Sequence, residues 1–204
     1  MYASPRYPAT DEQIEAFVSS MFHGTVIACP PDGHPQASIL PFVKEGAEIE
    51  LHFVRKDPVF AALQQSPRCT FLISDYLAFT PHDFVDPADA GRATLHFRAV
   101  SYFCEAHDIS TDPVAVAGAL GRLLRHHEPG ASYDEVQVDA RYEARLRMLG
   151  TARLTVVGSQ AKFKTGPADT LEVKRRVIER LRQRGASGDH RAAEVIESYL
   201  PPRG

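Results

Sequence analysis

The sequence predicts a mainly β protein with peripheral helices, built as a small antiparallel barrel. Three observations predict it: about six short apolar strand patterns, turn residues between them, and helices that occur singly instead of alternating regularly with strands. The chain has 204 residues, 44% of them hydrophobic, and a net charge of −3, which excludes a disordered chain and does not point to nucleic acid. The sequence contains no glycine-rich phosphate-binding loop, so this signal of a doubly wound parallel sheet is missing.

The N-terminal part predicts a helix followed by a hairpin. Thr10 and Gln13 form a capping-box pattern, and the apolar residues after them share one helical face, so we expect a helix at about 11–22. The β-branched run 25–28 and the extended run 36–43 are separated by a Pro-Pro-Asp-Gly turn. This arrangement is typical of a β-hairpin with a longer loop.

The next part predicts a strand, a capped helix, a strand and a loop. Residues 49–54 form a short strand pattern, and Asp57-Pro58 supplies an N-cap and a first-turn proline for a helix through about Gln65. Residues 68–74 read as a buried strand. Residues 76–91 lose periodicity, and we interpret them as a long loop of the kind that is usually functional in a compact domain.

The second half of the chain contains strand and helix signals of the same kinds. We expect a strand at 94–105 and a helix that begins at Asp112-Pro113 and ends near Gly130. Residues 133–148 are mixed and partly helical, and residues 151–157 form a strand pattern.

The C-terminal part predicts a last short strand at 162–164 and a helix capped by Asp169 with Glu172. We therefore expect a single domain over 1–204 with a C-terminal helical segment at about 167–200. The helix around Arg175 is rich in basic residues, which makes it the candidate for DNA contact. We favour a solvated surface helix, because no helix-turn-helix pair precedes it.

The cysteines and histidines suggest neither disulfides nor metal. Cys29, Cys69 and Cys104 are odd in number and widely spaced, which favours free thiols in a cytoplasmic protein. No apolar run resembles a signal peptide or is long enough to span a bilayer, so we expect no membrane association. His82, His96 and His107 have no metal-ligand spacing, so we expect no metal site. We expect most of the nine histidines at surface or capping positions.

One segment suggests a phosphate site. Arg55 and Lys56 end a strand directly before a helix N-terminus, where fixed positive charge and unpaired backbone N–H groups together hold phosphates. The alternative is a solvated basic pair beside a capped helix. Asp57 favours this alternative, because its carboxylate could accept from the same donors.

The order of these motifs resembles the PaiB-like FMN-binding split-barrel family, whose members are described as negative transcriptional regulators. The resemblance starts at Met1-Tyr2 and continues through Asp32–Phe42, which is similar to the family's Asp-Gly-x-Pro-x-Ala-Thr-His-Leu-Pro-Phe. Leu51–Pro58 is similar to its Gly-His-Met-Ala-Arg-Ala-Asn-Pro. Three further segments match: Phe79–Phe84 with Ile-Ser-Pro-Ser-Trp-Tyr, Ala93–Val100 with Pro-Thr-Trp-Asn-Tyr-Val-Ala-Val, and Lys162–Lys164 with Lys-Trp-Lys.

The resemblance implies a six-stranded antiparallel split β-barrel that forms a homodimer, with FMN in a groove at the dimer interface. The cofactor-binding residues that it implies are Ser38, Ile39, Leu40, Arg55, Lys56, Thr80, Thr94 and Lys164. Ser38, Ile39 and Leu40 would lie along the edge of the isoalloxazine or the ribityl chain. Arg55 and Lys56 would neutralise the phosphate. Thr80 and Thr94 would lie at the rim of the cofactor site, and Lys164 would be a contact from the second subunit.

The chain departs from the family pattern around this site. Ile39 replaces a histidine, and Asp83 and Leu95 replace tryptophans in a chain that has no tryptophan at all. Each lost hydrogen bond is worth roughly 0.5–1.5 kcal/mol. Three functions therefore stay open: an FMN-binding regulator or flavin-dependent oxidoreductase, a cofactor-free dimeric regulatory protein, and a haem-binding split barrel. The resemblance assigns no catalytic residues.

Overall fold

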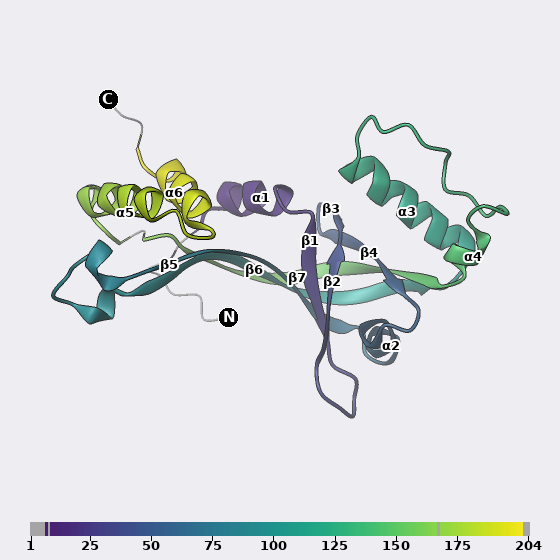
Figure 1. The fold of residues 1–204 in the computed structure, drawn as a ribbon. Helices are drawn as coiled ribbons and strands as arrows, with labels where there is room; N and C mark the ends of the chain where they lie inside the picture. Colours follow the sequence, from purple (N-terminus) through teal and green to yellow (C-terminus); the bar gives the residue numbers. More distant parts are fainter. Residues whose placement is uncertain (1–6, 8, 167, 202–204) are drawn as a thin grey trace. The chain divides into compact units, whose positions relative to one another are not determined.

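Seven strands form one sheet in the order β2-β1-β5-β6-β7-β4-β3 (Figure 1). The computed structural model describes residue 7 and residues 9–166 and 168–201, so the Met1-Tyr2 motif lies outside the described residues. The strands are β1 (His23–Ala28), β2 (Gln36–Pro41), β3 (Val43–Glu45), β4 (Glu48–Val54), β5 (Arg68–Thr80), β6 (Thr94–Ser110) and β7 (Leu149–Lys164). The pairings β1–β2, β1–β5, β3–β4 and β4–β7 are antiparallel.

Helices occur singly between the strands and as a pair at the C-terminus. They are α1 (Asp11–Ser19), α2 (Pro58–Gln65), α3 (Pro113–His127), α4 (Glu143–Leu146), α5 (Leu171–Arg184) and α6 (Asp189–Ser198), with the 3-10 turns η1 (His82–Phe84) and η2 (Ala90–Arg92). The predicted class, a mainly β antiparallel fold with peripheral helices, is confirmed. Among the described residues, no helix is both long and apolar enough to cross a membrane.

The chain divides into two compact units. Unit 1 comprises Met1–Ile14, Ser74–Val100 and Gln160–Gly204, and unit 2 comprises Glu15–Ile73 and Ser101–Ser159. The long strands β5, β6 and β7 contribute residues to both units.

The strand count is seven instead of the predicted six, and the described strands do not close into a barrel. The extended run 36–43 divides at Phe42, where β2 ends beside β1 and β3 begins beside β4, at the other end of the strand order. Phe42 is buried, and its ring lies 5.2 Å from that of Phe71. The side chain that interrupts the strand is therefore a core residue of unit 2, which a continuous extended pattern does not reveal.

Helix α2 packs in unit 2 as its sequence predicts. Asp57 is the N-cap, with its side chain accepting from the Val59 N–H, and Pro58 is the first helical residue. The ring of Phe60 lies against Gly150 of β7, where an added Cβ would come within 2.4 Å of Cζ. Gly150 thus lets the helix approach the sheet closely.

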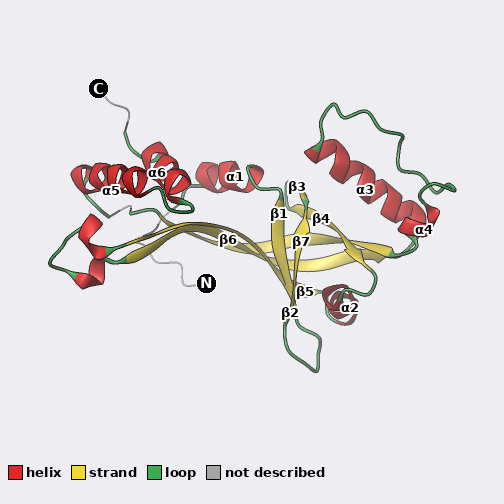
Figure 2. Ribbon diagram, viewed as in Figure 1, coloured by secondary structure: helices red, strands yellow, loops and turns green. Residues whose placement is uncertain are grey.

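In unit 1, strand β5 continues to Thr80, so the predicted loop at 76–91 is wrong over its first residues. Leu77 and Ala78 are both buried in a cluster with Val177, Ile178 and Leu181 of the neighbouring helix α5. Two adjacent buried residues break the in-out alternation of a strand, which explains why the pattern hid it. The rest of the predicted loop contains η1 and η2, between β5 and β6 (Figure 2).

Boundaries of other elements also differ from the prediction, including the end of β6 at Ser110 instead of residue 105. Helix α1 ends at Ser19 instead of about residue 22, and residues 162–164 are the end of β7 instead of a separate strand. The N-cap of α5 is Thr170, whose hydroxyl accepts from the Val173 N–H at 3.3 Å. Asp169 instead forms an ion pair with Arg92.

Candidate functional site

The predicted residue Ser38 is engaged with the N-cap of α2 in unit 2. Its Oγ lies 2.9 and 2.7 Å from the two carboxylate oxygens of Asp57, to which it donates. The same carboxylate accepts from the Val59 N–H at 2.8 Å, and the Ala61 N–H bonds to the Asp57 carbonyl at 3.2 Å. Since Pro58 has no N–H, most donors of this first turn are satisfied by the protein itself.

The basic pair before α2 is divided between two roles. Arg55 donates from Nε to the Leu149 carbonyl at 3.0 Å and from Nη2 to the Thr111 carbonyl. Lys56 is exposed, and no hydrogen bond or ion pair is recorded for it among the described parts of the chain. Ile39 is also exposed, at 71% of its surface, and Leu40 is half-buried. Lys56 is therefore the member of the pair whose charge faces solvent without a partner among the residues that the structure describes.

A cavity of about 240 Å³ in unit 1 brings together two other predicted residues, Thr94 and Lys164. Thr94 is the first residue of β6 and Lys164 the last of β7, and these strands are neighbours in the sheet. The remaining lining residues are Tyr7, Val85, Gly91, Arg92, Ala93, His96, Gly166, Ala168 and Asp169. Two positions far apart in the sequence thus share one cavity because the strands that carry them are adjacent.

His96 is the residue of this cavity that sequence reasoning missed. We expected a surface or capping position, but only 3% of its surface is exposed, and neither ring nitrogen makes a hydrogen bond of normal geometry among the described residues. Burial lowers the pKa of His96 to about 4, although the Asp169 carboxylate and the Lys164 backbone oppose the change. The imidazole is therefore neutral near pH 7 and offers one donor and one acceptor. The family resemblance did contain a signal for a polar site residue here, because His96 stands where the family motif has an asparagine.

The charged groups of the cavity are not all paired. Arg92 and Asp169 form an ion pair at 2.7 Å. The Lys164 ammonium is half-buried and has no recorded partner in the part of the chain that the structure describes, and burial together with the nearby Lys162 lowers its pKa. Gly166 has a φ of +73°, and an added Cβ would lie 2.8 Å from an Asp169 carboxylate oxygen. The backbone of Gly166 therefore lies too close to Asp169 to leave room for a side chain. One net positive charge is left facing the cavity.

Thr80, another predicted contact, lies elsewhere in unit 1. It is fully buried at the end of β5, and its Oγ1 has no hydrogen-bond partner among the described residues. Thr80 is not among the residues that line the cavity. An unpaired buried hydroxyl lowers the free energy of unfolding, and no contact among the described residues offsets this cost at Thr80.

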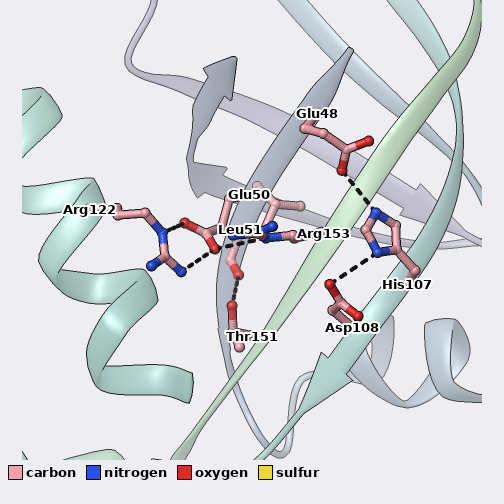
Figure 3. A network of polar contacts seen from close by, with 8 residues as sticks. All are labelled: Glu48, Glu50, Leu51, His107, Asp108, Arg122, Thr151 and Arg153. Carbon is pink, nitrogen blue, oxygen red and sulfur yellow. Dashed lines mark hydrogen bonds and ion pairs between the residues drawn. The ribbon is translucent and has the colours of Figure 1, made fainter. Parts of the chain in front are cut away.

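A second charged cluster lies in unit 2 around Glu50 of β4 (Figure 3). Arg122 of α3 donates to the Glu50 carboxylate at 2.6 and 2.7 Å, and Arg153 of β7 lies 3.4 Å from it. Burial opposes ionisation of Glu50, but the two arginines hold its pKa below the usual range. Nearby, Glu48 bonds to His107 at 2.8 Å, and this contact together with the Thr155 hydroxyl lowers the pKa of Glu48.

The basic helix α5 uses several of its arginines inside unit 1. Arg176 donates to the carbonyls of Phe84 and Val85, and Arg180 bonds to Asp83 at 2.9 Å. Arg184 binds both carboxylate oxygens of Asp189, at 2.6 and 2.8 Å. These cations therefore hold η1 and the start of α6, whereas Arg175 stays exposed.

The antiparallel sheet with its peripheral helices resembles the split-barrel fold of solved flavin-binding proteins. Residues 1–158 match the family model described as "Putative FMN-binding domain". The chain belongs to this family of FMN-binding domains. A search of curated proteins found no match.

Several solved structures share the fold. The conserved hypothetical protein Rv2991 from Mycobacterium tuberculosis is similar at 20% identity over 80% of this chain and 91% of that one, with a TM-score of 0.56. The FAD and heme binding protein from Mycobacterium smegmatis is similar at 19% identity over 82% and 78%, with a TM-score of 0.57. The flavocytochrome Anf3 from Azotobacter vinelandii gives 19% over 83% and 79%, with a TM-score of 0.58. At these identities the likeness shows the fold.

Proposed function

We propose that this chain binds a flavin, with FMN as the expected form, and that it acts as a homodimer. The observation that carries the proposal is the unit 1 cavity in a chain of the FMN-binding domain family: Thr94 and Lys164 line it together with a buried His96, whose ring nitrogens make no hydrogen bond of normal geometry among the described residues. Bound flavin supplies electron or hydride transfer, and the protein supplies binding and orientation. The finer proposal is a regulator of the PaiB type or a flavin-dependent oxidoreductase.

The cavity residues fit part of a flavin. Thr94 and Lys164 offer donors, and neutral His96 offers a donor and an acceptor, which suits a ligand with both oxygen acceptors and a ring N–H. A volume of about 240 Å³ is below the roughly 300–1,000 Å³ of sites that enclose a whole ligand. A second copy of the chain is the source that we propose for the remaining surface.

Absorption spectroscopy of the purified protein tests the proposal directly. We expect flavin bands in the protein as isolated or after addition of FMN, and FMN at 100 times its Kd should stabilise the fold by about 2.7 kcal/mol. A colourless protein whose thermal unfolding does not change with saturating FMN would contradict the proposal. The dimer is tested on the same sample by light scattering with and without FMN.

The predicted phosphate contacts are tested by titrating variants with FMN. Arg55→Ala should weaken FMN more than Arg175→Ala, which removes an exposed arginine with no assigned contact. Loss of Arg55 removes both a charge and two hydrogen bonds to backbone carbonyls. Lys56→Ala removes a charge without such bonds, so it distinguishes a charge effect on FMN binding from a structural one. Equal affinities in all three variants would place the phosphate elsewhere.

A haem is the second candidate, and His96 is the observation that favours it. His96 would hold the iron of a haem through a ring nitrogen, since its imidazole is neutral and neither nitrogen makes a hydrogen bond of normal geometry among the described residues. Titration with haemin should then give a Soret band that His96→Asn abolishes. If neither cofactor binds, the cofactor-free dimeric regulator remains, and binding of labelled DNA tests its regulatory role.

A further inference from the structure

The cysteines of this chain, which are far apart in the sequence, line one pocket in unit 2. Cys29, Cys69 and Cys104 are all among the lining residues of this pocket, which has a volume of about 550 Å³. All three are free thiols. Cys29 is exposed, whereas Cys69 and Cys104 are only 9% and 2% exposed. The pocket therefore gives a small solute access to two thiols that are otherwise buried.

Cys69 and Cys104 face each other on neighbouring strands. Strands β5 and β6 are adjacent in the sheet, and the N–H of Ala106, late in β6, donates to the carbonyl of Pro67, directly before β5, at 2.8 Å. The two strands therefore run antiparallel. Cys69 lies two residues after Pro67, and Cys104 lies two residues before Ala106, so the two cysteines are opposite each other and on the same face.

This register suits a disulfide. Opposite residues of an antiparallel pair have Cα atoms about 4.5–5.5 Å apart. The Cα atoms of disulfide-bonded cysteines are usually about 4.4–6.8 Å apart. Cys69 and Cys104 can therefore be joined without a rearrangement of the two strands.

The two thiols share a hydrogen bond that makes them chemically unequal. The bond with Cys69 lowers the pKa of Cys104, assisted by the Phe71 backbone and opposed by burial and by the Glu48 charge. The same bond, together with burial, raises the pKa of Cys69. Since the thiolate is the nucleophile in sulfur oxidation, we expect Cys104 to react first and Cys69 to react second.

Two alternatives fit these cysteines less well. Among the described residues, no group of three or more His, Cys, Asp or Glu side chains is arranged to hold a metal ion. Buried cysteines also pack as small apolar side chains, but such packing requires neither a facing pair nor access from a pocket. The low exposure of Cys104 favours a small oxidant over a bulky one.

We propose that Cys69 and Cys104 are a modification site at which a peroxide converts the two facing thiols into a disulfide. The Cys104 thiolate attacks one oxygen of hydrogen peroxide, so that an S–O bond forms, the O–O bond breaks, and hydroxide leaves and takes up a proton. Cys69 then loses its proton and attacks the Cys104 sulfur, so that the S–S bond forms, the S–O bond breaks, and water leaves. In total, two thiols and one peroxide give one disulfide and two waters.

This inference is independent of the proposed flavin binding, because all three cysteines belong to unit 2 and the cavity of His96 belongs to unit 1. Either of the two proposals can fail without the other.

Peptide mapping of the folded protein after treatment with hydrogen peroxide tests the site. We expect the intact mass to fall by two hydrogen atoms, the peptides of Cys69 and Cys104 to be linked, and Cys29 to stay open to alkylation. Dithiothreitol should reverse the change. The same treatment of the chain unfolded in urea is the control, because Cys29 should form disulfides there as well.

Variants separate the roles of the three thiols. Cys69→Ser should abolish the disulfide and leave Cys104 as a sulfenic acid that dimedone labels, whereas Cys104→Ser should lose both the disulfide and the label. Cys29→Ser is the matched control from the same pocket and should form the disulfide as the wild type does. Should a buried variant fail to fold, mapping of the wild type and of Cys29→Ser still decides. Cys69 and Cys104 that stay reduced in the folded protein while Cys29 is oxidised, or a disulfide that includes Cys29, would overturn the inference.

Discussion

The two charged clusters, around Glu50 in unit 2 and around Lys164 and His96 in unit 1, are built from similar residue types but differ in how their polar groups are paired. The Glu50 carboxylate has three contacts from two arginines (Figure 3). In the unit 1 cavity, the His96 imidazole makes no hydrogen bond of normal geometry among the described residues, and the Lys164 ammonium has no hydrogen bond or ion pair there. Buried polar groups in folded proteins are normally paired, so the unpaired cluster is the one that we assign to binding.

The energetic difference between the clusters follows from this pairing. Charge-assisted bonds from Arg122 offset the cost of burying Glu50, which is 13% exposed. A buried polar group without a partner costs about 1–3 kcal/mol, and His96 and Thr80 both carry that cost. The Glu50 cluster therefore stabilises the fold, whereas the unit 1 groups destabilise it until a ligand pairs them.

The largest expected effect is a pH dependence caused by His96. The unfolded chain takes up a proton at His96 near pH 6.5, but the folded chain does so only near pH 4. Between these values the unfolded state binds more protons, so the contribution of His96 to stability falls as the pH falls, by up to about 3 kcal/mol. Urea unfolding of the wild type and of His96→Asn should show a free-energy difference that changes over this window. A difference independent of pH would mean that His96 is not buried in its neutral form.

Removal of the Glu50 charge should have a smaller effect on stability and none on binding. Glu50→Gln leaves Arg122 and Arg153 without their carboxylate, and we expect a loss of about 1.5 kcal/mol of unfolding free energy. The FMN affinity of the same variant, measured by calorimetry, should match the wild type. A variant that keeps its stability but loses affinity would reverse our assignment of the two clusters.

Thr80→Val should stabilise the protein, in contrast to Glu50→Gln. The change keeps the shape of the side chain and removes a fully buried hydroxyl without a recorded partner, so the free energy of unfolding should rise by about 1 kcal/mol. Chemical denaturation measures this rise. Weaker FMN binding in the stabilised variant would show that the hydroxyl serves the cofactor, whereas lower stability would show that it has a partner in the folded protein.

The smallest effect is expected at the exposed rim of the Glu50 cluster. Glu48 and His107 are both about two-fifths exposed, so water competes for their contact. Glu48→Gln should cost about 0.5 kcal/mol or less in denaturant unfolding, and added salt should reduce this cost further. A cost as large as that of Glu50→Gln would mean that the two glutamates act as one unit.

The sequence predicted those features whose cause is local. Asp57-Pro58 marks the start of α2 because capping and the missing N–H of proline act within one helical turn. The short strands before Ile73 were predicted from local apolar runs and turn residues, although the division of the run 36–43 at Phe42 was not. Strand β5 beyond that point was hidden, because Leu77 and Ala78 are buried by helix α5, about a hundred positions away in the chain.

By itself, the sequence determined the antiparallel β class and the capped helices, and its resemblance to a known family supplied Thr94 and Lys164 as candidate site residues. Only the tertiary structure decided which polar groups are paired. Arg55 donates to carbonyls 56 and 94 positions away, and His96 is buried instead of facing solvent. The physical reason is that a hydrogen bond depends on the positions of both partners in space, whereas sequence patterns report only on residues within a few turns of each other.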